Sequence, residues 1–251
     1  ILTSVRDTRN FLFLNDGLGN FTESLNIGWV YNQRAGSVGS SMADVDGDGD
    51  LDLYVTSHLN RTPGEILGPK EMERIHQLGE AARRTGRPMP DEWLEIYSVR
   101  KVPITPTFNK LVTDVSHMQD HLYLNDGRGR FRVVTDNDQR FRDAQGRPMP
   151  MPKDPSHEAA FRDVDGDGDP DLYVCADFDW ADRFWRNDGR GNFTLIDPIA
   201  LRRTSQFSMG IDFTDLNRDG HVDFITADML SRSHKRRKTQ MGFMQATDVA
   251  I

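Results

Sequence analysis

The sequence predicts an all-β fold made of β-propeller blades, each with four antiparallel strands, together with a helical insertion. Three observations predict this fold. An aspartate-rich segment recurs along the chain, an Asn-Asp-Gly turn alternates with it, and short runs rich in Val, Leu, Tyr and Phe flank both. A repeat of roughly 50 residues with four short strands has the size of one propeller blade.

The strands are predicted from the residues around the two recurring motifs. A small-residue strand precedes each aspartate-rich segment, and a β-prone run such as LDLYV follows it. Each Asn-Asp-Gly sequence lies between two further runs and is typical of a tight hairpin. The hairpins are FLFLNDGLGNF from Phe11, HLYLNDGRGRF from His121 and RFWRNDGRGNF from Arg183.

The order of the motifs predicts the domain boundaries. Residues 1–57 hold a partial blade and the start of the first full blade, 58–118 an insertion, 119–228 the remaining blades, and 229–251 a basic tail leading into a further blade. Closed propellers have roughly 4 to 8 blades. We therefore expect the chain to be part of a longer polypeptide. In an alternative, the two partial blades complete one another in a small three-bladed ring.

The insertion is predicted to be helical. In the segment from Pro69 to Gly86, a proline opens the helix, acidic residues come early, and a glycine follows the basic end. One apolar face is formed by Met72, Ile75, Leu78 and Ala82. A second, shorter helix is expected near Asp91, with Trp93, Leu94 and Tyr97 buried. Both helices are expected to cover the first blade, either as packing or as a lid over a ligand.

The aspartate-rich segments predict three calcium sites, because Ca²⁺ takes about 6 to 8 oxygen ligands and alternating carboxylates on a turning loop supply them. We call residues 44–52, 163–171 and 215–223 the first, second and third aspartate loops. Side-chain ligands are expected from Asp44, Asp46, Asp48 and Asp52, from Asp163, Asp165, Asp167 and Asp171, and from Asp215, Asn217, Asp219 and Asp223. Backbone carbonyl ligands are expected from Asp50, Asp169 and His221. The neutral Asn217 predicts the weakest site in the third loop.

Three alternatives to calcium loops of this kind fit less well. An EF-hand also begins Asp-x-Asp-x-Asp-Gly, but it needs a Glu at loop position 12 and a helix on each side. Here that position holds Val55, Val174 and Thr226, and strand-forming residues follow. Acidic turns without a metal would concentrate like charges in each loop. Mg²⁺ prefers one or two carboxylates and keeps its waters.

The aspartate loop followed by a Leu-Tyr-Val strand resembles the FG-GAP (VCBS) repeat of integrin α-subunit propellers. The LNDGxGxF pattern and the segment SMGIDFTDLNRDGHVDF are similar to bacterial proteins related to cartilage acidic protein, which often carry an ASPIC/UnbV domain. The resemblance covers the chain except the insertion. It implies a secreted, periplasmic or cell-surface propeller that holds calcium between the first two strands of each blade.

Composition limits the possible partners. The net charge of -8 argues against nucleic-acid binding, which needs a basic surface. No apolar run approaches the roughly 20 residues of a membrane-spanning helix. We expect a protein or glycan ligand on the extracellular side, bound by an adhesion module in which calcium is structural. Cys175 is the single cysteine and is expected to be a small buried residue.

An enzyme is the alternative function, although no catalytic motif such as Gly-x-Ser-x-Gly or His-Glu-x-x-His is present. A hydrolase or lyase acting on polysaccharide would use His157 and Glu158 in the propeller channel and the helical insertion as a lid. His117, Asp120 and His121 are a weaker candidate for a transition-metal cluster. The basic residues Arg232, Lys235, Arg236, Arg237 and Lys238 would contact an acidic surface, and Trp180 or Trp185 would stack on sugars.

Overall fold

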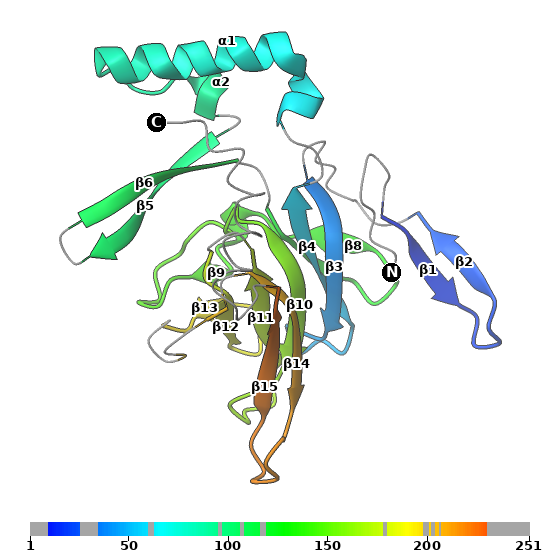
Figure 1. Cartoon of the computed structure of the whole chain (residues 1–251). Coiled ribbons are helices and arrows are strands. Elements are labelled where there is room, and N and C mark those ends of the chain that lie inside the picture. The colour runs from blue at the N-terminus through cyan, green and yellow to red at the C-terminus, as the bar shows by residue number, and fades with distance from the viewer. Residues whose placement is uncertain are drawn as a thin grey trace.

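The computed structural model describes residues 10–25, 35–59, 63–94, 97–105, 108–115, 119–177, 180–197, 201, 204–205 and 207–229. These residues are mostly β-strands in several sheets, with one long helix (Figure 1). The predicted β architecture with a helical insertion is confirmed at this level. The described sheets do not close into a barrel or a ring.

The first repeat unit is a four-stranded antiparallel sheet in the predicted strand order. Its strands pair in the order β3-β4-β7-β8 and are β3 (Ala35–Ala43), β4 (Asp52–Leu59), β7 (His121–Asn125) and β8 (Phe131–Val133). The first aspartate loop joins β3 to β4, and the Asn-Asp-Gly turn joins β7 to β8. The insertion lies between β4 and β7, and the chain returns to pair directly beside β4.

The second repeat unit has the same four strands and a short additional one. Its order is β10-β11-β12-β13-β9, with β10 (Ser156–Arg162), β11 (Asp171–Ala176), β12 (Arg183–Asn187), β13 (Phe193–Leu195) and β9 (Phe141–Arg142). β9 precedes this unit in sequence and pairs in parallel with β13, so that Phe141 lies opposite Phe193. The sequence did not predict β9.

Two hairpins at the ends of the described chain form separate two-stranded sheets. They are β1 (Leu12–Asn15) with β2 (Phe21–Ser24), and β14 (Ser208–Thr214) with β15 (Asp223–Asp228). They correspond to the predicted last two and first two strands of a blade. The two hairpins do not pair with each other, in contrast to the alternative three-bladed ring.

The main hydrophobic core lies between the first and second repeat units. Both units contribute, with Tyr54 and Leu122 from the first and Leu172, Trp185 and Phe193 from the second. Trp185 is 1% exposed, so its ring packs in the core and does not present a face for sugar stacking. Cys175 is buried with a free thiol, as expected.

The insertion combines a helical part with a strand pair. Helix α1 (Pro63–Thr85) is kinked at Gly68, so its regular part begins at Pro69 as predicted, and α2 (Asp91–Leu94) follows. Ile75 and Trp93 are the buried centre of a small core of their own. The hairpin of β5 (Tyr97–Thr105) and β6 (Phe108–Val115) was not predicted. No helix in the described ranges has the length and apolar character needed to cross a membrane.

Candidate metal centres

The first two aspartate loops each bring three carboxylates together. One oxygen from each of Asp44, Asp46 and Asp48 lies within 4.8 Å of the others. The same arrangement is found for Asp163, Asp165 and Asp167. Because the loops connect the first two strands of each unit, the sequence repeat places equivalent carboxylate groups in both sheets.

The first aspartate of each loop organises the backbone. Oδ1 of Asp44 accepts hydrogen bonds from the backbone N–H groups of Gly47 and Asp48, and Oδ2 accepts one from Gly49 at 2.9 Å. Gly47 and Gly49 have positive φ values of 75° and 92°, a conformation that glycine adopts without steric cost. Asp163 accepts from Gly166 and Gly168 in the same way. The turn therefore depends on the aspartate and glycine spacing of the sequence.

The last aspartate of the first and of the second loop connects its loop to the Asn-Asp-Gly turn of the same unit. The buried Asp52 accepts hydrogen bonds from Val45 N at 3.0 Å and from Asn125 N at 2.9 Å, the latter at the Asn-Asp-Gly turn. Burial raises the pKa of Asp52 to about 6. Asp52 is not in the group of mutually close carboxylates, and the same is true of Asp171, which accepts from Val164 N and Asn187 N. Their roles as ligands remain predictions.

Asp46 provides the observation that most favours a cation. Among the described residues, its Oδ1 is buried and accepts no hydrogen bond. Burial, and then the nearby charge of Asp48, raises the pKa of the Asp46 carboxyl. A buried oxygen without a partner in an anionic cluster is costly, and a divalent cation would satisfy both its lone pair and its charge. Hard carboxylate oxygens are the ligands that Ca²⁺ prefers, so the residues present fit this ion.

The fourth aspartate of the first and of the second loop faces the Asn-Asp-Gly turn of its own unit. A Cβ atom on Gly127 would collide with the Asp50 carboxylate, and one on Gly189 with that of Asp169. Both glycines also have positive φ, which explains why the turn carries glycine. Burial, followed by the charges of Asp167 and Asp163, raises the pKa of Asp169. Coordination by the Asp50 and Asp169 carbonyls remains a prediction.

The third aspartate loop repeats the hydrogen bonds of the other two. Asp215 accepts from the backbone N–H groups of Arg218 and Gly220, and Asp223 accepts from Leu216 N. Asn217 donates from Nδ2 to Oδ2 of Asp219 at 3.0 Å. Hydrogen bonds from the His221 N–H and from Asn217 lower the pKa of Asp219. The third loop therefore has the same backbone hydrogen bonds as the first two loops, with an amide in place of one carboxylate. Coordination by the His221 carbonyl remains a prediction.

Asn187 connects the two units at their aspartate loops. Its Nδ2 donates to the carbonyl of Val45 at 2.8 Å, in the first loop, and to the carbonyl of Pro170 at 3.2 Å, in the second loop. The side chain is almost fully buried. The equivalent Asn125 donates to the Leu51 carbonyl of its own unit. The first and second candidate sites are therefore mechanically linked.

The other sequence candidates are not assembled into a site. His117 and the basic residues 232–238 lie outside the described residues. The buried Asp120 accepts hydrogen bonds from the Tyr54 hydroxyl and Ser57 N, and does not form a metal-capable group with His121. Sequence reasoning missed a group made of His58, His157 and Asp177, whose ligand atoms lie within 4.8 Å of one another. Only His157 carried a signal, as a polar residue where the other repeats have Val38 and Met209.

Comparison with known proteins supports the assignment of the repeats. A family model described as FG-GAP-like repeat matches residues 1–55 and 163–226. These regions include the first, second and third aspartate loops up to Val55 and Thr226. No curated protein matches the chain. On the match and on the repeated strand, loop and turn geometry, the chain contains FG-GAP-like repeats.

Proposed function

We propose that the chain is a calcium-binding FG-GAP-type β-propeller module for extracellular binding or adhesion, in which about three Ca²⁺ ions have a structural role. The observation that carries the calcium assignment is the buried Oδ1 of Asp46, which accepts no hydrogen bond within the described chain, in the Asp44, Asp46 and Asp48 cluster. The second loop has an equivalent cluster, and the third has the same backbone hydrogen bonds.

The arrangement of the repeat units supports a propeller. The first strands of three successive units, β3, β10 and β14, are neighbours in that order (Figure 1). Each carries a register irregularity at the same repeat position, between Ser37 and Gly39, Ser156 and Ala159, and Ser208 and Gly210. Equivalent strands that pack side by side with the same bulge are expected of blades around a common axis.

A structural role for calcium is supported by the hydrogen bonds that the loop aspartates make. Asp44 fixes the turn, and Asp52 joins the first loop to the hairpin at Asn125. With no cation, like charges in the loop repel one another and the buried carboxylates raise the free energy of the folded state. Neutralisation by Ca²⁺ would stabilise the turn between two strands and, through Asn187, the neighbouring unit.

The binding role rests on the FG-GAP repeat and on the surface chemistry. An acidic chain neutralised by calcium suits a protein or glycan partner outside the cell, and we place the module in a secreted, periplasmic or cell-surface setting. Screening the calcium-loaded chain and the chelated chain against glycan and matrix-protein arrays tests this role. Binding that requires calcium is expected, and turnover of a polysaccharide would instead favour the enzyme.

The calcium assignment is tested by thermal unfolding at matched ionic strength in Ca²⁺, in Mg²⁺ and in chelator. We expect Ca²⁺ to raise the midpoint well above the other two conditions, because the ion binds the folded loops and not the unfolded chain. Three coincident curves would contradict the proposal.

A residue substitution locates the ions. Asp46→Ala should lower the calcium stoichiometry, measured by calorimetric titration, by about one ion, because it removes a carboxylate from a site that needs about 6 to 8 oxygens. The matched control is Asp16→Ala, since Asp16 is exposed and accepts from Leu18 N in the first hairpin turn. Unchanged stoichiometry in Asp46→Ala would remove this residue from the ligand set.

A further inference from the structure

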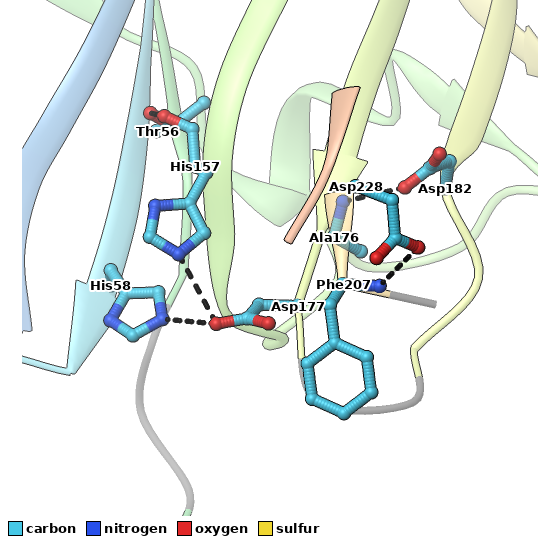
Figure 2. Close-up of polar contacts among 8 residues, drawn as sticks. All are labelled: Thr56, His58, His157, Ala176, Asp177, Asp182, Phe207 and Asp228. Carbon is cyan, nitrogen blue, oxygen red and sulfur yellow. Dashed lines mark hydrogen bonds and ion pairs between the residues drawn. The ribbon is translucent and has the colours of Figure 1, made fainter. Parts of the chain in front are cut away.

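Two histidines and an aspartate from two repeat units converge on one point. His58 is near the end of β4, His157 is the second residue of β10, and Asp177 directly follows β11. Nε2 of His58 and Nε2 of His157 each lie 3.1 Å from Oδ2 of Asp177. Figure 2 shows both imidazole rings pointing toward the same carboxylate oxygen. Three ligand atoms therefore surround one small volume.

The group lies at the end of the strands remote from the aspartate loops. The loops follow β3 and β10 and precede β4 and β11, whereas His58 and Asp177 lie at the opposite ends of β4 and β11. The backbone on this side is held in place. Thr56 Oγ1 donates to the His157 carbonyl at 2.9 Å, across the junction of the units, and Asp177 N donates to the Pro155 carbonyl at 2.9 Å.

We propose that His58, His157 and Asp177 form a binding site for Zn²⁺ or a similar first-row transition-metal ion, separate from the aspartate loops. Imidazole nitrogen and carboxylate oxygen are common zinc ligands, with bond lengths of about 2.0 to 2.2 Å. Two ligands at that distance in tetrahedral geometry are roughly 3.3 Å apart. The two observed separations of 3.1 Å are close to this value.

The two rings converge closely on one carboxylate oxygen. The two ring centroids are 4.4 Å apart with an interplanar angle of 32°, and both Nε2 atoms are directed at a single oxygen. Without a metal, both rings must place an Nε2 proton on that oxygen, and charging both would set two cations against one anion. A metal ion replaces both protons and uses the lone pairs of all three atoms.

The group is specific to this junction and is not a general feature of the repeat. His58, Asp177 and Met229 have equivalent positions, each six residues after the last aspartate of its loop, and His157 is equivalent to Val38 and Met209. In the third unit, Asp228 lies one residue before Met229 and accepts hydrogen bonds from Ser205 and, as Figure 2 shows, from Phe207 N. The imidazole from β10 is thus present only where a second imidazole, from β4, can meet it.

The exposure of the three side chains permits metal exchange. The side chains of His58 and His157 are 15% and 26% exposed, whereas that of Asp177 is 2% exposed. The carboxylate of Asp177 is therefore buried, and the two imidazoles lie at the solvent boundary. Sites with three protein ligands commonly keep a further position for water or another ligand.

The site is tested on the full chain, first treated with chelator and then saturated with Ca²⁺ so that the aspartate loops are filled. We expect one equivalent of Co²⁺ to give the visible absorption of a tetrahedral N/O site, and Zn²⁺ to displace it. His58→Gln, His157→Gln and Asp177→Asn should each weaken Zn²⁺ binding at least about tenfold, since even loss of an outer-shell partner costs that much. The control is His76→Gln on α1, a half-buried histidine outside the group.

Two outcomes would overturn the proposal: no stoichiometric Zn²⁺ or Co²⁺ binding by the wild-type chain, or equal binding by the three variants and the control. X-ray absorption of the zinc-loaded wild-type chain provides a readout that does not depend on variant folding. An imidazole scattering shell is expected, and an all-oxygen shell would place the ion in the aspartate loops. The test is independent of the calcium proposal, because Ca²⁺ is present throughout.

Discussion

Asp120 shows how a single buried carboxylate makes stability depend on pH. It accepts hydrogen bonds from the Tyr54 hydroxyl at 2.9 Å and from Ser57 N at 2.7 Å, beside β7. Burial raises the pKa of Asp120 from 3.8 to about 7, an effect that these hydrogen bonds and the charge of Arg183 offset only in part. Between these two values the folded chain holds a proton that the unfolded chain has released. The contribution to stability is therefore present at low pH and lost as the pH rises toward 7.

The expected result is that Asp120→Asn reduces the fall in unfolding free energy between pH 5 and pH 7.5 by roughly 1 kcal/mol or more. Urea denaturation in saturating Ca²⁺ measures it, with Asp143→Asn as control. Asp143 is a partly exposed carboxyl whose pKa is lowered by its contacts with Arg147, so it titrates below this window. Parallel pH profiles for the wild-type chain and Asp120→Asn would contradict the assignment.

The residues of a candidate site could be predicted from the sequence only where they are close to one another along the chain. The spacing of Asp44, Asp46 and Asp48 already implies convergence, because alternate residues on one turn share a centre. The meeting of His58 with His157 depends on the packing of one repeat unit against the next. No local pattern encodes that packing, so the group is evident only once the strands are placed.

At the scale of the elements, the strands and turns that border a repeated motif could be predicted from the sequence. Elements such as β9 and the β5-β6 hairpin, which border no such motif, could not, because they form through tertiary contacts. The order β3-β4-β7-β8 was predictable because each strand borders a recognisable motif. The two residues of β9 form a strand only because β13 lies beside them. The β5-β6 hairpin was missed because it lies in a segment whose helix signals dominate, and its register is set by pairing.

Helix α1 provides a prediction in which local propensity and packing oppose each other. Gly79 lies inside α1, where Ala would ordinarily stabilise a helix by about 0.5 to 1 kcal/mol. A Cβ atom there would lie 2.6 Å from Nε1 and 2.8 Å from Cδ1 of Trp93, a side chain that is 3% exposed. Gly79→Ala should therefore destabilise the α1-α2 core, by about 1 to 3 kcal/mol, because the indole must shift.

Hydrogen exchange of the α1 amides measures this local effect, which global unfolding would not isolate. Faster exchange is expected in Gly79→Ala. The control is Glu80→Ala at the next, exposed position, where little change or slight protection is expected. Slower exchange in Gly79→Ala would show that helix propensity outweighs the contact with Trp93.

For the whole molecule, the junction between repeat units decides whether the sheets behave as one body. β3 lies beside β10, and Gly39 allows the close approach: a Cβ atom there would lie 2.6 Å from the His157 carbonyl oxygen and 2.8 Å from Thr56 Oγ1. Gly210 has the equivalent position in β14, and its Cβ would meet only the Glu158 carboxylate, at 3.2 Å. The first contact involves fixed backbone, and the second the end of a flexible side chain.

Gly39→Ala should therefore separate the first two units and lower the free energy of unfolding by about 1 to 3 kcal/mol, whereas Gly210→Ala should change it little. Denaturation followed by intrinsic tryptophan fluorescence measures both, because Trp185 lies in the core that the units share. If the units unfold as one body, Gly39→Ala shifts the whole transition; if the junction is weak, the curve divides into two steps. Equal stability of the two variants would mean that β3 and β10 do not pack closely in solution, and the inter-unit geometry of the His58, His157 and Asp177 group would fail with it.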